Sequence, residues 1–147
     1  QDTSKYGFSA VPIGNDLFHW EVRLFDFDSK DGIHGDLQKY KANFGIDYIL
    51  MDMKFPPEYP FKPPFIRVVK PRLQFHTGHV TIGGSICMEL LTPSGWMPSN
   101  SIESILIQIR MQLIVGNGRI DFANTAPYTE EEAHSAFNRV ARDHNWI

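Results

Sequence analysis

The chain has 147 residues, of which 42% are hydrophobic, and carries a formal net charge of −3 at neutral pH. This length favours one domain spanning residues 1–147, large enough to bury about two-thirds of its unfolded surface. The ordinary composition excludes a disordered chain, and the weak negative charge argues against a nucleic-acid-coating role.

The first part of the chain predicts four strands, because apolar and polar residues alternate along it. Pro12 suggests an edge strand or a bulge in the first of them, and the turn residues 14–16 predict a hairpin with the second. A short, weak helix is expected over residues 37–45, ending at Gly45. The expected strands span residues 6–13, 17–27, 46–55 and 65–71.

Helical periodicity dominates the second part of the chain. One helix is expected from Ile102 onward, with Asn100 as its N-cap and Gly116 as its end. A second is expected over residues 129–146, where Thr129 and Glu132 form a capping box. Its inward stripe is predicted to contain Ala133, Phe137, Val140 and His144.

The order of these elements predicts an α+β fold, in which C-terminal helices pack on one face of a four-stranded antiparallel meander. An irregular segment over residues 71–99 separates the last strand from the helices. Long segments of this kind in compact domains are usually functional, and this one contains Cys87, the only cysteine of the chain.

Several interpretations of Cys87 compete. A lone cysteine is often a buried apolar filler. A cysteine protease would use His76 or His79 as its base, and a metal site would combine both histidines with the thiol, but no typical spacing supports either. The remaining chemistry is a thiol that carries an acyl group as a thioester and passes it to an amine.

Three motifs in one order bear on this choice. They are "EYPFKPPFIRVV" at residues 58–69, "GGSICMELL" at 83–91 and "GWMPSNSIESILIQI" at 95–109. With this order and spacing, the chain from Tyr6 to Trp146 resembles the ubiquitin-conjugating enzyme family. The phrases "CMELLT", "GW" and "SIESI" are most similar to its divergent Q-type branch.

The resemblance implies that Cys87 accepts ubiquitin, or a related modifier, from an activating enzyme and gives it to a lysine, usually with a ligase. The family's His-Pro-Asn triplet, with asparagine eight residues before the cysteine, is replaced by Thr77, Gly78 and His79. His79 is therefore the candidate oxyanion donor or base. His76 takes this place only if the loop shifts its register.

The same resemblance assigns residues outside the thiol loop. Pro60, Phe61 and Pro98 correspond to the loops that contact ligases in the family. Asp121 is the candidate for the acidic group near the acceptor lysine, chosen only by its place in the sequence. The basic N-terminal helix typical of the family is absent or truncated, since Tyr6 is expected in the first strand.

The sequence thus predicts a transferase that needs neither cofactor nor metal and whose partners are the modifier, an activating enzyme and a ligase. The alternatives are an inactive relative that binds ubiquitin or a ligase and, more distantly, a thiol hydrolase. A single cysteine, no signal peptide and no membrane-length apolar run favour an intracellular protein of cytoplasm or nucleus. Because the chain begins with Gln1, we interpret it as part of a longer protein.

Overall fold

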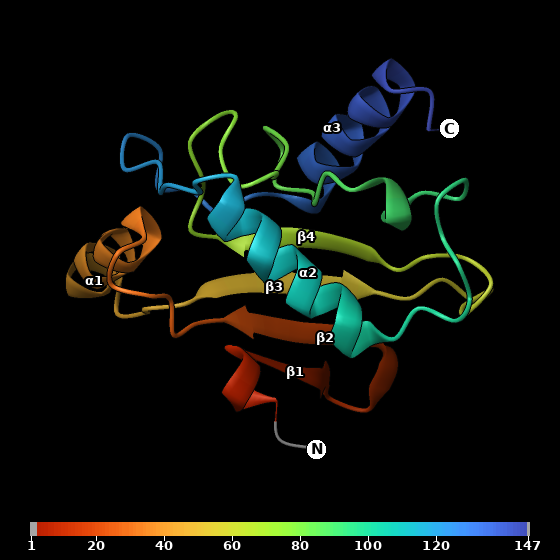
Figure 1. Cartoon of the computed structure of the whole chain (residues 1–147), viewed down its shortest axis with the longest axis horizontal. Helices are drawn as coiled ribbons and strands as arrows, with labels where there is room; N and C mark the ends of the chain where they lie inside the picture. The colour runs from red at the N-terminus through yellow and green to blue at the C-terminus, as the bar shows by residue number, and fades with distance from the viewer. Residues whose placement is uncertain (1–2, 147) are drawn as a thin grey trace.

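A computed structural model describes residues 3–146 and shows one four-stranded antiparallel sheet. The strands follow one another in space as they do in sequence, which confirms the predicted meander (Figure 1). The strands are β1 (Phe8–Ile13), β2 (Asp16–Leu24), β3 (Ile49–Lys54) and β4 (Phe65–Lys70).

The N-terminal edge of the sheet differs slightly from the prediction. Tyr6 lies in a one-turn 3-10 helix, η1 (Ser4–Tyr6), and not in the first strand. The strand begins after Gly7, whose left-handed backbone (φ +80°) turns the chain into β1. The β1–β2 register shifts between Pro12 and Ile13, so Pro12 does mark an irregular edge strand.

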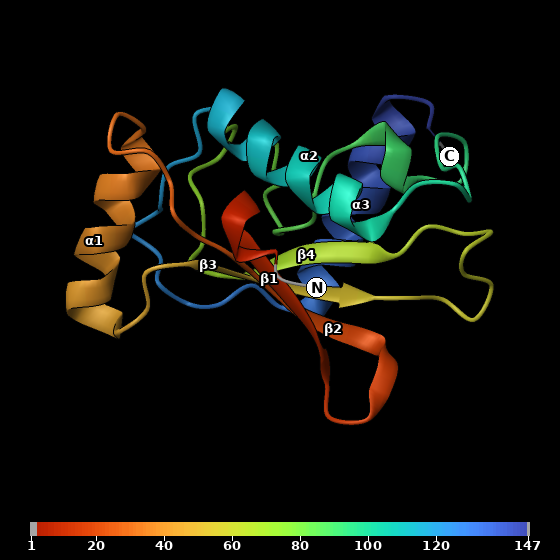
Figure 2. The ribbon, with the colours of Figure 1, turned by 60° about the horizontal axis from the view of Figure 1, so that its bottom comes forward.

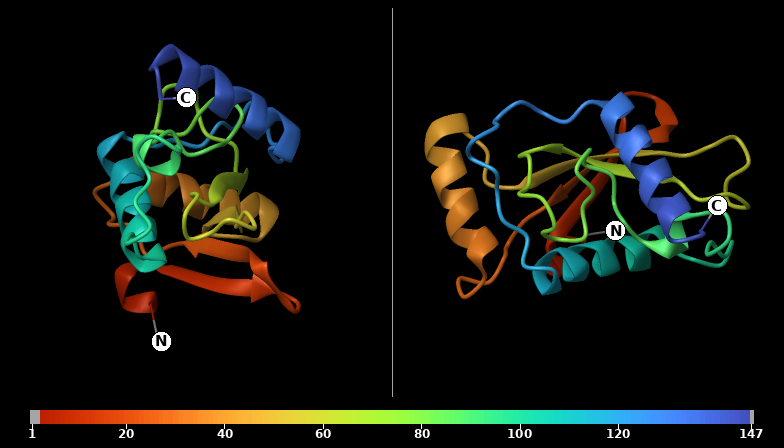
Figure 3. Two further views of the ribbon diagram at one scale, coloured as in Figure 1. Left: turned by 90° about the vertical axis from the view of Figure 1, so that its right-hand side faces the viewer. Right: turned by 90° about the horizontal axis from the view of Figure 1, so that it is seen from above.

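Three helices surround the sheet. Figures 1 and 3 show α2 (Ile102–Val115) across one face, α1 (Gly32–Phe44) beyond one end of the strands, and α3 (Glu130–Asp143) along the β4 edge. The core lies between α2 and the sheet, because the buried stripe of α2 meets the alternate buried residues of β2, β3 and β4. That stripe consists of Ile105, Leu106, Ile109 and Leu113.

The predicted helix over residues 37–45 is longer than expected. It starts at Gly32 and ends, as predicted, before Gly45 in the left-handed conformation. Ile33, Leu37 and Tyr40 form its buried stripe. Two glycines and several aspartates near its start are typical of turns, which is why the sequence pattern concealed its first turn.

The helix caps are partly as predicted. Ser101, not Asn100, caps α2, because its Oγ accepts a hydrogen bond from the Ser104 amide at 3.1 Å. The capping box of Thr129 and Glu132 at α3 is confirmed. His144 is exposed at the C-cap of α3 and does not belong to the buried stripe, where alanines at 133, 136 and 141 pack instead.

The long connection between β4 and α2 has one turn of 3-10 helix, η2 (Glu89–Leu91), and is otherwise irregular. In Figure 2 it passes between α2 and α3 before reaching the far end of the sheet. Within residues 3–146, none of the helices combines the length and the apolar character that a membrane crossing requires.

Candidate active site

The Cys87 loop is fixed along the outer edge of β4. The Val68 amide donates to the Gly84 carbonyl at 2.7 Å, and the Ile86 amide donates to the Ile66 carbonyl at 3.1 Å. Ser85 is completely buried and forms an isolated bridge with Arg67. These bonds hold the chain up to Ile86, so the position of Cys87 is set by the sheet.

The two glycines before Cys87 are needed for close packing. A Cβ added to Gly83 would lie 2.1 Å from the Glu132 carbonyl oxygen of α3, and one added to Gly84 would lie 2.6 Å from the Tyr128 ring. Because glycine has no Cβ, α3 and the Tyr128 ring can pack directly against this part of the loop. The two glycines do not open space for a substrate, because α3 and Tyr128 occupy the space next to them.

A separate cavity of about 510 Å³ provides the space beside Cys87. Its walls come from the segment around His76 and His79, from Gly116 after α2, and from the last turns of α3. The structure thus brings together the three chemically important residues that the sequence predicted. It adds four that were not predicted as site residues: Arg139, Val140 and Asp143 of α3, and His144 at its C-cap.

His79 has an unusual backbone and a free ring. Its φ of +57° is in the left-handed region, and its carbonyl accepts a hydrogen bond from the Cys87 amide at 2.9 Å. The ring lies over Gly116, where an added Cβ would be 2.7 Å from Cδ2. Among residues 3–146 the ring has no hydrogen-bond partner, so it can serve a substrate.

His76 lines the same cavity but is placed differently. Its φ is +62°, and its ring lies against Phe75 with 3.7 Å between ring centroids. The backbone contact to Cys87 belongs to His79 and not to His76. Of the two histidines, His79 is therefore the one that the backbone ties directly to Cys87.

The Cys87 thiol is half-buried, and this burial raises its pKa. The free thiol is thus protonated at neutral pH, because burial is the effect that determines its pKa and no charge among residues 3–146 offsets it. A cysteine protease depends on the opposite arrangement, in which a histidinium lowers the thiol pKa. No group of three or more His, Cys, Asp or Glu side chains within residues 3–146 is arranged to hold a metal ion.

Helix α1 is connected to the His79 segment by a chain of hydrogen bonds. The buried Asp36 carboxylate accepts hydrogen bonds from Arg119 Nε at 2.7 Å and from the Ile120 amide at 3.0 Å. The Arg119 amide in turn donates to Thr77 Oγ1, and the Gly78 amide donates to the Gly116 carbonyl. The segment that carries His79 is therefore tied through residues 116–120 to α1.

The expected ligase-contacting residues lie on two neighbouring loops. Trp96 Nε1 donates to the Pro60 carbonyl at 2.7 Å, which joins the β3–β4 loop to the loop before α2. Phe61 is 77% exposed, and Pro60 and Pro98 are exposed as well. None of the three lines the Cys87 cavity.

Asp121 does not line the Cys87 cavity either. Its Oδ1 accepts hydrogen bonds from the amides of Ala123 and Asn124, in a local turn. It lies at the border of a second hollow beside α3. An acceptor-side role for Asp121 stays a prediction.

Comparison with known proteins decides the family. Residues 1–144 match the family model described as ubiquitin-conjugating enzyme. The chain belongs to this family. It is 42% identical over 142 residues to human ubiquitin-conjugating enzyme E2 Q1, with 95% of the chain aligned, and 35% identical over 145 residues to human ubiquitin-conjugating enzyme E2 Q-like protein 1. The predicted resemblance to the Q-type branch is confirmed.

The lengths of these relatives differ. The chain spans 33% of human E2 Q1 but 86% of the human Q-like protein 1. Solved structures also match. A ubiquitin-conjugating enzyme E2 from Plasmodium falciparum has a TM-score of 0.55 at 19% identity, covering 74% of this chain and 82% of its own. Human ubiquitin-conjugating enzyme E2 G1 has a TM-score of 0.52 at 26% identity, covering 73% and 79%. The family fold is thereby confirmed.

Proposed function

We propose that this chain carries ubiquitin, or a related modifier, as a thioester on Cys87 and transfers it to an acceptor amine. The observation that carries the proposal is the half-buried Cys87, which opens on a 510 Å³ cavity next to an unengaged His79 in a chain of the ubiquitin-conjugating family. The partners proposed with it are the modifier, its activating enzyme and a ligase.

The first step is a thioester exchange. Cys87 Sγ attacks the thioester carbonyl of the modifier on the activating enzyme, whose own thiol leaves, while the Cys87 proton passes to a base of that enzyme or to water. The burial that raises the pKa of Cys87 keeps the free thiol protonated until this encounter, which limits its oxidation.

The second step transfers the acyl group. A deprotonated lysine amine attacks the carbonyl, an oxyanion forms, and its collapse expels Cys87 Sγ as the amide bond forms. The amine loses its second proton, and the thiol regains one. His79, on the wall of the same cavity, donates a ring N–H to the oxyanion, because neutral imidazole always keeps one donor nitrogen.

Charging is the direct test. The purified protein is incubated with activating enzyme, ATP and ubiquitin, and adducts are separated without reductant. Wild-type protein should form a band that thiol removes, Cys87→Ser should form a thiol-resistant ester or nothing, and Cys87→Ala should form nothing. A thiol-sensitive band on Cys87→Ala would refute the proposal, since the chain has no other cysteine.

The same experiment separates the main alternative, an inactive module that binds ubiquitin or a ligase. Such a module would bind without charging, whereas a thiol hydrolase would release the modifier to water without an amine acceptor. Persistence of the wild-type thioester until lysine is added would exclude both.

A further inference from the structure

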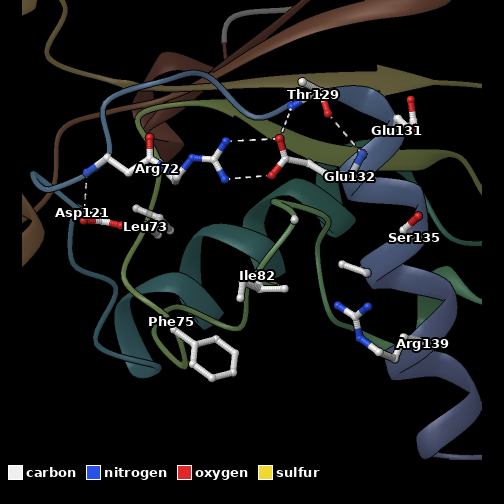
Figure 4. A pocket seen from close by; sticks show the side chains of 13 residues that line it. Arg72, Leu73, Phe75, Ile82, Asp121, Thr129, Glu131, Glu132, Ser135 and Arg139 are labelled. Atoms are coloured by element: carbon white, nitrogen blue, oxygen red, sulfur yellow. Dashed lines mark hydrogen bonds and ion pairs between the residues drawn. The ribbon is translucent and has the colours of Figure 1, made fainter.

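The cavity beside Cys87 continues into a larger hollow along α3. The two share Phe75, Ile82 and Arg139 in their linings, so they form one surface depression with the thiol at one end. The second hollow measures about 800 Å³ and extends to the turn at Asp121 (Figure 4). We call this second hollow, between α3 and the residues Phe75 and Ile82, the α3 groove.

Some charged groups of the α3 groove are already engaged. Arg72 and Glu132 form a two-pronged ion pair with distances of 2.8 and 3.1 Å, and Glu132 also caps α3 at Thr129. Asp121 accepts from its own turn. These groups build the wall and offer little to a ligand.

Three other polar groups of the α3 groove are free. Glu131, Ser135 and Arg139 follow one another at four-residue spacing on α3, and within the described part of the chain their side chains have no hydrogen-bond or ion-pair partner. Arg139 is the one of the three that also lines the Cys87 cavity, and in Figure 4 it projects from α3 towards Ile82. The α3 groove thus has a free cation near the thiol and a free anion farther away.

The opposite wall of the α3 groove is apolar and exposed. Phe75 is 62% exposed and Ile82 is 54% exposed, although both project from a segment whose backbone is firmly bonded. Adjacent exposed apolar side chains bordered by unpaired charges are typical of surfaces that bind another chain.

We propose that the α3 groove binds the chain segment flanking the acceptor lysine and that Arg139 selects acceptors with a carboxylate close to that lysine. An apolar side chain of the same segment packs between Phe75 and Ile82. This inference rests on the proposed function and names its substrate class.

Position and charge together favour the acceptor over the modifier as the occupant of the α3 groove. The terminal carboxyl of the modifier is consumed in the thioester, so this group cannot pair with Arg139. The acceptor is the occupant that position favours, because the α3 groove opens into the cavity where the lysine must arrive, and a carboxylate beside that lysine complements the free Arg139.

The spacing of the free charges sets the expected sequence preference. Eight residues of helix, from Glu131 to Arg139, span about 12 Å, which equals roughly four residues of extended chain. A carboxylate close to the lysine would reach Arg139, because Arg139 lines the Cys87 cavity, and a basic side chain about four residues farther would reach Glu131.

The test uses wild-type protein charged with ubiquitin and measures single-turnover discharge to synthetic peptides with one lysine. Each pair of peptides differs only in glutamate or glutamine two residues from the lysine, with one pair for either direction. We expect one pair to show about a five- to tenfold preference for glutamate, the gain from one charge-assisted pair. The preference should shrink as ionic strength rises.

Two variants give the test its specificity. Arg139→Glu should abolish the preference for glutamate and create one for a peptide with arginine at the same position. Arg142→Glu makes the same charge change one turn further along α3, at an exposed residue that lines neither hollow, and should keep the wild-type preference. Equal effects of both variants would mean that only net charge matters, and would overturn the inference.

Discharge to free lysine separates the remaining outcomes. Failure of wild-type protein to form a thioester would overturn the proposed function and this inference together. Normal charging and normal discharge to free lysine, with no difference between the peptides of either pair, would overturn the α3 groove inference alone. The same lack of preference, with ligase-stimulated discharge lost in Arg139→Glu, would assign the α3 groove to a ligase instead.

Discussion

His79 stands eight residues before Cys87, where the family usually has asparagine, and its ring is free within the cavity. If the ring donates to the oxyanion, its removal should slow discharge of the thioester to free lysine by about ten- to a thousand-fold, as expected for one preorganised donor. Single-turnover discharge of purified thioester measures this effect. Charging should suffer less, because the activating enzyme supplies its own catalytic groups.

The left-handed backbone at His79 decides which variants are informative. Alanine is strained at a φ of +57°, whereas glycine, asparagine and aspartate tolerate it. Discharge of the thioester to free lysine should be slow in His79→Gly and should recover much of its rate in His79→Asn. It should stay slow in His79→Asp, since a carboxylate has no hydrogen to donate to the oxyanion. Recovery by aspartate but not asparagine would indicate a base, and a wild-type rate in His79→Gly would leave the ring without either role.

At the scale of elements, the β3–β4 loop gives a prediction that is independent of the thiol. Phe61 is 77% exposed and far more accessible than a residue that holds the fold together. Phe61→Ala should weaken ligase-stimulated discharge at least tenfold, because an exposed aromatic side chain on a proline-restrained loop is an efficient anchor. Discharge to free lysine should change far less.

Phe44 on α1 provides the matched control for this experiment, since it is also exposed, at 47%, but belongs to another element. Phe44→Ala should leave ligase stimulation intact. If Phe61→Ala instead lowered the rate equally in ligase-stimulated discharge and in discharge to free lysine, Phe61 would be a residue that the fold requires.

Elements with a strong local pattern could be predicted, and those set by distant contacts could not. The strands and α2 follow from periodicity alone, and the α3 capping box is a local signal. The first turn of α1 is stabilised by packing and by the Asp36–Arg119 pair, whose partners are 83 residues apart. The local sequence around Gly32 contains no pattern that would predict an ion pair with so distant a residue.

In the candidate active site, too, residues in local motifs could be predicted, whereas residues brought in by distant contacts could not. The sequence identified Cys87, His76 and His79 because they lie within a few residues of one another and within recognisable motifs. It missed the cavity wall from Arg139 to His144, because α3 reaches the thiol only through tertiary packing at Gly83. The distance in sequence conceals this contact, and only the folded chain shows it.

For the molecule as a whole, three carboxylates predict how stability depends on pH. Burial alone would raise the pKa of Asp36, but hydrogen bonds from Arg119 and Ile120 lower it overall. Arg72 lowers the pKa of Glu132, and Lys54 lowers that of Glu130. A carboxyl whose pKa is lower in the folded state stabilises the protein above its unfolded pKa. The free energy of unfolding should therefore fall as the pH drops below about 4.

Glu132→Gln tests this origin of acid sensitivity. The variant loses the ion pair to Arg72, whose side chain is mostly buried, and should be less stable than wild type by about 2 kcal/mol at pH 7. Denaturant unfolding from pH 7 to pH 3 should show the two stability curves converging towards low pH, as wild-type Glu132 begins to take up a proton. Parallel curves would show that the pair contributes nothing to the pH dependence.

Positive φ angles between 54° and 62° occur at His76 and His79, which line the Cys87 cavity, and at Asn117, which follows Gly116 of the cavity wall. Each of these positions admits few amino acids in any descendant of this chain, whatever its side chain does. Drift there should be confined to histidine, asparagine, aspartate and glycine, and a β-branched residue at position 79 would mean that the loop has been rebuilt. The backbone conformation thereby restricts which side chains can occur beside the thiol. Of the four residues that it admits, only asparagine and histidine have a side-chain N–H that can donate to an oxyanion.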